Sequence, residues 1–299
     1  MNDVPFEFVD SVLYVLTQHT VKVVQKLCGY IGLSAASTLL GCYNHCYILK
    51  DGVLDREYCR YQFRTGDHED LRTTKYLFST NIHLAPGRRG GDRTPEINQD
   101  LFLQIASRKN QRSYFCFEIN TSRIDKKWVQ LLSSWPRLQE LVIHVPIEGP
   151  IQELLAKVVR RGSVSLFQHS SRRIGPPARK LIVDLFLQPQ FDILCSPSVL
   201  VLLEILRLWL DGKVSRGKDV ELTQECADFA AIFDMAFALD PTSAFEKNYD
   251  SDSKVYCLTV NEGQGERKVL LVFDCDGKPE SMDEKSYVKE TRAMYFRFR

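Results

Sequence analysis

The chain has 299 residues, of which 44% are apolar and 11% aromatic, so it can build one large or two ordinary hydrophobic cores. Its 39 basic and 38 acidic residues leave a net charge of +1, which supplies no field to attract nucleic acid or an anionic membrane surface. The nine cysteines are scattered and odd in number, unlike a disulfide framework, and no uncharged run of 18 apolar residues predicts a membrane span. We therefore expect a globular protein of a reducing compartment, cytoplasmic or nuclear, that binds neither nucleic acid nor membrane.

Residues 1–45 are predicted to form short helices, because their apolar residues recur at helical spacing and Gly29 and Gly32 interrupt them. The first helix begins at Pro5 and carries apolar stripes on two neighbouring faces. The two stripes consist of Phe6, Val9, Leu13 and Leu16, and of Phe8, Val12 and Val15. One stripe is enough to pack the helix on its own body, so the second indicates either burial on most sides or contact with a partner.

Residues 46–110 are predicted to be a connecting region. Within it, REYCRYQFRT (56–65) alternates in polarity, which predicts a strand. The segment LAPGRRGGDRTPEIN (84–98) is rich in glycine and proline, which predicts a loop or linker and a domain boundary.

Residues 111–245 alternate short strands with helices, and the strands are expected near residues 115–119, 140–145, 164–167, 190–194 and 219–223. Their inward-facing centres, spaced by 26, 23, 27 and 29 residues, are expected to be Phe117, Ile143, Leu166, Ile193 and Leu222. Leu138, Leu141 and Ile143 spell L-x-x-L-x-I, the strand signature of leucine-rich repeats, whose units run about 20 to 29 residues. The region therefore predicts a leucine-rich-repeat-like α/β solenoid, with an ordinary α/β sheet as the alternative.

Residues 246–299 change character again. The segments KVYCLTVNEG, RKVLLVFD and AMYFRF alternate in polarity or run apolar, with EGQGE and CDGKPE as glycine-bearing turns. This pattern predicts a C-terminal antiparallel β element, as expected where the end of a repeat stack must be covered.

The helical start VPFEFVDSVLYVL, the middle segment LLSSWPRLQELVI and the β end together resemble the nematode-expanded family of F-box and F-box-like proteins. Val4 and Pro5 stand where that family has Leu-Pro. The resemblance implies that the N-terminal helices bind the Skp-type adaptor of a cullin–RING ubiquitin ligase, and that the repeats select an unknown protein substrate. On this reading the adaptor-binding residues are Pro5, Phe8, Val12 and Val15, and the protein is no enzyme and needs no cofactor. In GYIGLSAASTLL the chain departs from the family, with two glycines and no tryptophan, so the alternative is an interaction scaffold of F-box ancestry that no longer binds the adaptor.

Catalytic and metal-binding motifs are not evident in the sequence. It has no G-x-G-x-x-G, Walker loop, H-E-x-x-H or G-x-S-x-G, so an enzyme would need a deep polar pocket that the sequence does not predict. Cys42, Cys46, Cys59 and His68 could supply four zinc ligands, but they lack a second close pair. Cysteines four apart also suit one buried helix face, and we expect no bound metal.

The open side of the repeat sheet is the predicted substrate-binding surface, because side chains that flank the inward-facing centres point to the opposite face. These residues are Glu118, Val142, His144, Ser165, Phe167, Asp192 and Glu221. A row of mixed acidic, aromatic and small side chains on a rigid sheet suits protein recognition, although the same row could also serve only to solvate that face.

Overall fold

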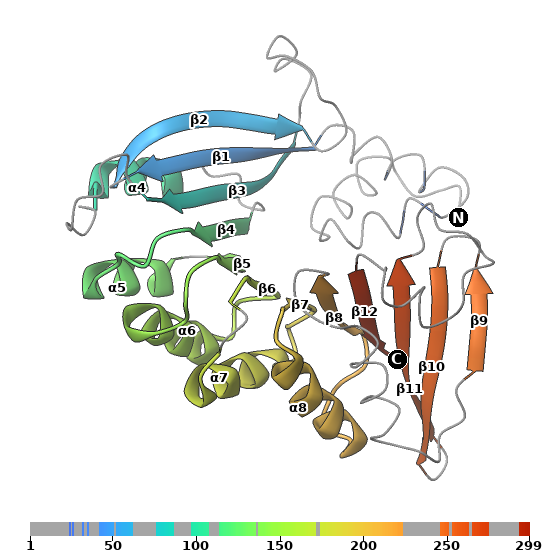
Figure 1. Cartoon of the computed structure of the whole chain (residues 1–299). Helices are drawn as coiled ribbons and strands as arrows, with labels where there is room; N and C mark the ends of the chain where they lie inside the picture. The colour runs from blue at the N-terminus through green and yellow to red at the C-terminus, as the bar shows by residue number, and fades with distance from the viewer. Residues whose placement is uncertain are drawn as a thin grey trace. The chain divides into compact units, whose positions relative to one another are not determined.

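The structure is a computed structural model of the chain (Figure 1). It describes residues 42–50, 52–61, 76–86, 97–107, 114–135, 137–171, 174–223, 246–250, 253–262, 265–274 and 293–299, and single residues at 24, 26, 32 and 35. The predicted helix that begins at Pro5 lies outside the described residues. The chain divides into two compact units: the first contains Met1–Arg123 and Pro136–Leu138, and the second contains Ile124–Trp135 and Gln139–Arg299.

The first unit contains a sheet with the strand order β2-β1-β3-β4. Its strands are β1 (Cys42–Lys50), β2 (Val53–Tyr61), β3 (Tyr76–Ala85) and β4 (Tyr114–Ile119). A two-residue turn with Gly52 at φ 79° joins β1 to β2 as an antiparallel hairpin, because glycine adopts a positive φ without strain. Strand β3 runs parallel to both β1 and β4, so the chain must cross over between β3 and β4.

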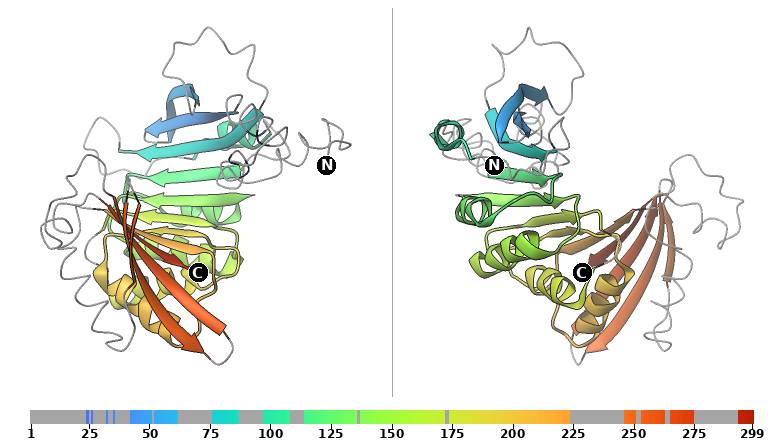
Figure 2. Two further views of the ribbon diagram at one scale, coloured as in Figure 1. Left: turned by 90° about the vertical axis from the view of Figure 1, so that its right-hand side faces the viewer. Right: turned by 60° about the vertical axis from the view of Figure 1, so that its left-hand side comes forward.

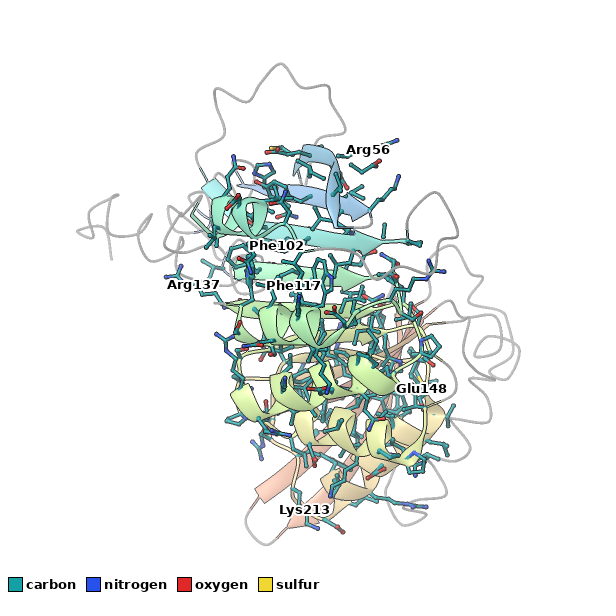
Figure 3. All side chains as sticks on the ribbon, turned by 90° about the vertical axis from the view of Figure 1, so that its left-hand side faces the viewer. Arg56, Phe102, Phe117, Arg137, Glu148 and Lys213 are labelled. Carbon is teal, nitrogen blue, oxygen red and sulfur yellow. The ribbon has the colours of Figure 1, made fainter. Side chains whose placement is uncertain are left out.

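Helix α4 (Gln99–Ser107) belongs to the connection between β3 and β4. Asn98 caps it by accepting a hydrogen bond from the backbone of Leu101 at 3.1 Å. Phe102 of α4 and Phe117 of β4, both labelled in Figure 3, are at most 2% exposed and belong to the core of this unit.

The structure divides this part of the chain differently from the sequence analysis. Strand β1 begins at Cys42, inside the segment 1–45 that was predicted to be helical. Strand β2 covers residues 56–61 of the predicted strand 56–65, and residues 62–65 lie outside the described residues. Region 46–110 is not merely a connection, because β1, β2 and β3 build a sheet there. Strand β4 confirms the strand that was predicted near residues 115–119, and within the first unit it also pairs with β3.

The second unit contains strands in the order β5-β6-β7-β8-β12-β11-β10-β9. Strands β5 (Leu138–Ile143), β6 (Leu166–His169), β7 (Ile193–Cys195) and β8 (Lys218–Thr223) are parallel neighbours in chain order. Helices α5 (Lys126–Ser134), α6 (Gly149–Arg161), α7 (Pro176–Phe186) and α8 (Val199–Leu210) alternate with them and contact one another in chain order. Figure 2 shows these helices on one side of the parallel strands. The predicted alternation of strands and helices is therefore confirmed for this unit.

The register of the parallel strands corrects two of the predicted inward positions. Leu141 is opposite Phe167, and Phe167 is opposite Leu194. All three are at most 1% exposed, whereas Leu166 and Ile193, which were predicted to face inward, are half-buried on the other face. The prediction failed because both members of each adjacent pair are apolar, so alternation alone does not choose the buried one. The true spacings, 26 residues from Leu141 and 27 from Phe167, are more even than predicted.

The C-terminal residues form the antiparallel strands that the sequence predicted, β10, β11 and β12, and also the strand β9, which it did not predict. They are β9 (Glu246–Asp250), β10 (Ser253–Glu262), β11 (Gly265–Asp274) and β12 (Ala293–Phe298). Strand β12 pairs with β8, so this element continues the parallel sheet rather than forming a separate domain. Met294, Phe296 and Phe298 are fully buried and extend the core.

Polar side chains of each strand–helix unit bind the end of the preceding helix. Arg161 donates to the carbonyl oxygens of Ser133 and Trp135 at the end of α5, and Gln188 donates to Val159 O of α6. Lys218 donates to the carbonyls of Phe186 and Gln188 at the end of α7. The last carbonyls of a helix have no partner within the helix, so these contacts satisfy them and tie successive units together.

Candidate functional site

One face of the parallel strands in the second unit is covered by helices, and the other carries a mixed set of half-buried side chains. We call this second set the open face. It consists of Glu140, Val142, Leu166, Gln168, Ile193, Cys195, Asp219 and Glu221. The register aligns these residues in two rows across β5 to β8, and Tyr295 and Arg297 of β12 continue the rows. Apolar, polar and charged groups are therefore mixed on this face.

The centre of the open face is negatively charged. Cys195 donates to Glu221 Oε2 at 3.5 Å, and the pKa of its thiol is raised first by burial, then by Glu221 and then by Glu140. Both carboxylates thus lie close enough to act on the same sulfur atom, and the thiol stays protonated and inert. At the rim, Asp219 Oδ1 lies 3.3 Å from Arg299 Nη2, while Asp219 Oδ2 lies 3.8 Å from Arg297 Nε.

The structure places the predicted substrate-binding residues in different environments. Val142 and Glu221 lie on the open face, and His144, just beyond β5, is exposed and bonds to Ser170 Oγ at 2.8 Å. The prediction for Phe167 is wrong, because this side chain is fully buried in the core.

Three further predicted residues lie away from the open face. Ser165 precedes β6 and Asp192 precedes β7, and the two are joined by a backbone hydrogen bond of 2.8 Å. The charge of Asp192 raises the pKa of Lys218, against the larger opposing effect of burial, and Lys218 belongs to the helix-covered face. Glu118 belongs to the first unit. The adaptor-binding residues Pro5, Phe8, Val12 and Val15 lie outside the described residues.

A buried pair lies at the carboxyl ends of β6 and β7. His169 is the last residue of β6 and only 3% exposed. Its Nε2 lies 2.8 Å from the hydroxyl of Ser196, and burial lowers the pKa of His169 to about 4. The Ser196 oxygen also accepts from the backbone of Ser198, which precedes α8. Both side chains are buried, and we assign this pair to the packing of the core.

The first unit holds a second cluster that the sequence analysis did not identify. Cys46 on β1 is opposite Asn81 on β3, and His83 is opposite Glu118 of β4. Because Asn81 and His83 are two residues apart on one strand, all four side chains point to the same face of the sheet. We call Cys46, Asn81, His83, Glu118 and Asn120 the thiol–histidine cluster.

Hydrogen bonds fix the orientation of each group in the thiol–histidine cluster. Asn81 Nδ2 donates to Cys46 Sγ at 3.8 Å, and Asn81 Oδ1 accepts from the Ser79 hydroxyl at 3.0 Å. His83 Nδ1 lies 2.5 Å from Glu118 Oε2, while Glu118 Oε1 accepts from Asn120 at 2.9 Å. The carboxylate is thus held at both oxygens, and it fixes the plane of the imidazole ring.

The thiol of Cys46 acts directly on His83. Hydrogen bonding to Cys46 and then to Glu118 raises the pKa of His83 to about 9, against the opposing effect of burial. The other ring nitrogen, Nε2, is buried and receives no hydrogen bond of standard geometry from the described residues. Cys46 is only 1% exposed, while the side chains of His83 and Glu118 are 23% and 28% exposed. The sulfur atom of Cys46 is therefore buried, whereas the imidazole and the carboxylate on the same face are partly exposed.

The cysteines considered above as zinc ligands or as part of a buried helix face lie on strands. Cys42 and Cys46 lie on a strand, so their predicted place on a buried helix face is wrong. Cys59 is on β2 opposite His45, and His68 is outside the described residues. Within the described ranges, no three histidine, cysteine or acidic residues are grouped so that they could hold a metal ion.

Comparison of the chain with protein-family profiles, with curated proteins and with solved structures finds no match. No helix in the part of the chain that the structure describes has the length and apolar character required to cross a membrane. The functional conclusions below therefore depend on the residues and their geometry, together with the resemblance described above.

Proposed function

We propose that the protein is a non-catalytic substrate-recognition subunit of a cullin–RING ubiquitin ligase. The N-terminal helices bind a Skp-type adaptor, and strands β5 to β8 with their helices form a leucine-rich-repeat-like solenoid that binds the protein substrate. The observation that carries the substrate part is the open face, a row of mixed side chains on consecutive parallel strands whose opposite face is buried. The adaptor part rests on the apolar stripes of the helix that the sequence predicts from Pro5 onward.

The chemistry of the open face indicates the kind of substrate segment it would accept. Leu166 and Ile193 are neighbouring half-buried apolar residues. On the same face, the carboxylates of Glu221 and Glu140 both raise the pKa of the Cys195 thiol. Apolar contacts supply affinity, and a negative potential favours partners of opposite charge. The substrate segment is therefore one that carries lysine or arginine beside apolar side chains.

The adaptor interface is tested by a pull-down with purified Skp-type adaptor. Replacing Val12 and Val15 together by Asp places charges on the second apolar stripe, where each buried side chain is worth roughly 1.5 to 3 kcal/mol. We expect wild type to retain the adaptor and the double variant to lose it, with the circular dichroism of the two proteins unchanged. Equal retention by both would show that a different face binds.

The alternative function is an interaction scaffold that keeps the open face but does not bind the adaptor. The departures in GYIGLSAASTLL favour this alternative. It predicts that wild type fails to retain the adaptor, while proteins captured from extract are lost when Glu140 and Glu221 are both replaced by Gln. Glu153→Gln is the matched control, because Glu153 is an exposed residue of α6 that pairs with Lys157 at 3.1 Å.

A further inference from the structure

We infer that the substrate segment of the open face is bipolar. Its basic and apolar side chains lie on strands β5 to β8, and its acidic side chains lie on strand β12. This inference rests on the proposed function, because it takes the open face as the substrate-binding surface, and it adds a second subsite of opposite charge. Its basis is that the open face continues beyond β8 and carries basic residues there.

The open face continues across β12 onto β11. Tyr295 on β12 is opposite Val272 on β11, and cross-strand partners point to the same side of a sheet. Arg297 is opposite Leu270 in the same way. Both β11 residues are half-buried, whereas Leu271 between them is fully buried on the core side. The two rows of the open face therefore extend over two further strands and include apolar side chains there.

Basic side chains lie at this end of the open face, and we call Lys268, Arg297 and Arg299 the basic edge. Lys268 on β11 and Arg299 are joined by two backbone hydrogen bonds, of 2.9 and 2.7 Å. Each is two residues from a residue of the open face, Leu270 or Arg297, so the alternation of the strands puts both on the same side of the sheet. The sign of the charge on the open face therefore changes from β8 to β12 and β11.

The arginines of the basic edge keep donors for a further carboxylate. Asp219 is shared between them, with its oxygens 3.3 Å from Arg299 Nη2 and 3.8 Å from Arg297 Nε. Both distances exceed the roughly 2.7 to 2.9 Å of a strong charge-assisted hydrogen bond. The Arg297 guanidinium lies 5.9 Å from the centre of the Tyr295 ring, and a guanidinium that contacts a ring with its face still offers the N–H donors in its plane. Arg297 is therefore positioned to bind an acidic side chain of the substrate.

The carboxylates that attract basic side chains lie on the other part of the open face. Glu140 belongs to β5, and Glu221 accepts from the Cys195 thiol at 3.5 Å, so it points towards β7 and away from β12. Strands β6 and β7 between them contribute the half-buried Leu166 and Ile193. A segment that crosses the strands from β5 to β12 therefore meets carboxylates and apolar side chains before it meets the basic edge.

Charge and distance together set the kind of segment that fits. Strands β5 and β12 are four strand spacings apart, about 19 Å, which an extended chain spans with about six residues. A segment that is basic throughout would place a cation against the basic edge, and an acidic one would place carboxylates against Glu140 and Glu221. A segment with its two kinds of charge in separate halves satisfies both ends of the open face.

The test measures binding of fluorescein-labelled synthetic peptides to the full-length protein by fluorescence polarisation. The segregated peptide has two lysines at one end, two glutamates at the other, and alternating leucine and serine between them. In one matched peptide, glutamine replaces both glutamates. In the other, the same residues are rearranged so that lysine and glutamate alternate. We expect the segregated peptide to bind wild type at least fivefold more tightly than either matched peptide.

Two variants locate the acidic subsite. Arg297→Gln should weaken binding of the segregated peptide at least fivefold and change that of the glutamine peptide less than twofold. Arg207→Gln removes the same charge from an exposed position of α8, on the helix-covered side, and should leave both affinities unchanged. If Arg297→Gln does not fold, the ranking of the three peptides on wild type decides.

The outcomes separate this inference from the proposed function. If wild type binds the three peptides equally, or binds the segregated peptide no better than folded Arg297→Gln does, the acidic subsite is refuted and the recognition of basic and apolar side chains stands. If none of the peptides binds, the substrate part of the proposed function fails as well. A wild-type dimer in sedimentation velocity that Arg297→Gln dissociates would assign the basic edge to a second copy of the chain and would also overturn the inference.

Discussion

Lys218 offers the sharpest stability test of how the strand–helix units are joined. This lysine is 2% exposed, and its Nζ donates to the carbonyls of Phe186 and Gln188. The Nζ atom also lies 5.4 Å from the centre of the Phe186 ring. Lys218→Met keeps most of the aliphatic stem but removes both donors, which leaves two carbonyls at the end of α7 without these bonds.

The expected loss follows from the contacts. An unsatisfied buried acceptor costs about 1 to 3 kcal/mol, and a cation–π contact contributes about 0.5 to 2 kcal/mol. Removing a charge from a site where burial lowers its pKa to about 8 returns part of that cost. We therefore expect the free energy of unfolding to fall by about 2 to 4 kcal/mol.

Urea denaturation at pH 7 measures the change through the midpoint and slope of the transition. Lys213→Met is the matched control, because Lys213 (labelled in Figure 3) is 60% exposed and pairs only with Asp211 at 3.1 Å in the described structure. The control should stay within about 0.5 kcal/mol of wild type. A loss of less than about 0.5 kcal/mol for Lys218→Met, or equal losses in both variants, would refute this account of the contact.

Two further predictions concern the core and the response to pH. Phe167→Ala should lower the unfolding free energy by about 3 to 5 kcal/mol, and Leu166→Ala by less than about 1 kcal/mol, because only Phe167 is fully buried. A larger loss for Leu166→Ala than for Phe167→Ala would show that Leu166 is the buried residue of the two. The raised pKa of His83 contributes stability that is complete below pH 6.5 and lost as the pH rises through about 9, worth roughly 3 kcal/mol at most. Burial lowers the pKa of His169 to about 4, so its contribution is complete above pH 6.5 and lost as the pH falls towards 4. Denaturation across pH 4 to 9 should therefore show greatest stability near pH 6.5, and His83→Gln should flatten the alkaline side; an unchanged alkaline side in that variant would contradict the assignment.

Much of the second unit could be predicted from its sequence because each segment has one clear periodicity. Leu138, Leu141 and Ile143 follow the repeat signature, and all three are at most 1% exposed in β5. The alternating segments of β10 to β12 were also placed correctly. The register of β6 and β7 could not be predicted, because apolar residues are adjacent on both strands and only pairing with β5 decides which face is buried.

The thiol–histidine cluster could not be predicted because its members lie on separate strands and meet only through sheet pairing. His83 and Glu118 are outward-facing polar residues in alternating segments, NIHLA and CFEI, which is the one local signal they carry. Nothing in those segments specifies that β3 runs between β1 and β4. Cys46 was considered only as a zinc ligand or buried thiol, since the sequence does not place a histidine beside it.

Co-purification from cell extract decides between the proposed ligase subunit and the scaffold alternative. The tagged full-length protein would be isolated beside the variant with Val12 and Val15 replaced by Asp, and the amounts of Skp-type adaptor and cullin would be quantified. We expect adaptor and cullin both to co-purify with wild type in comparable molar amounts, and the variant to lose both. Absence of adaptor and cullin from the wild-type preparation, with other proteins still retained through the open face, would contradict the ligase function and support the scaffold alternative.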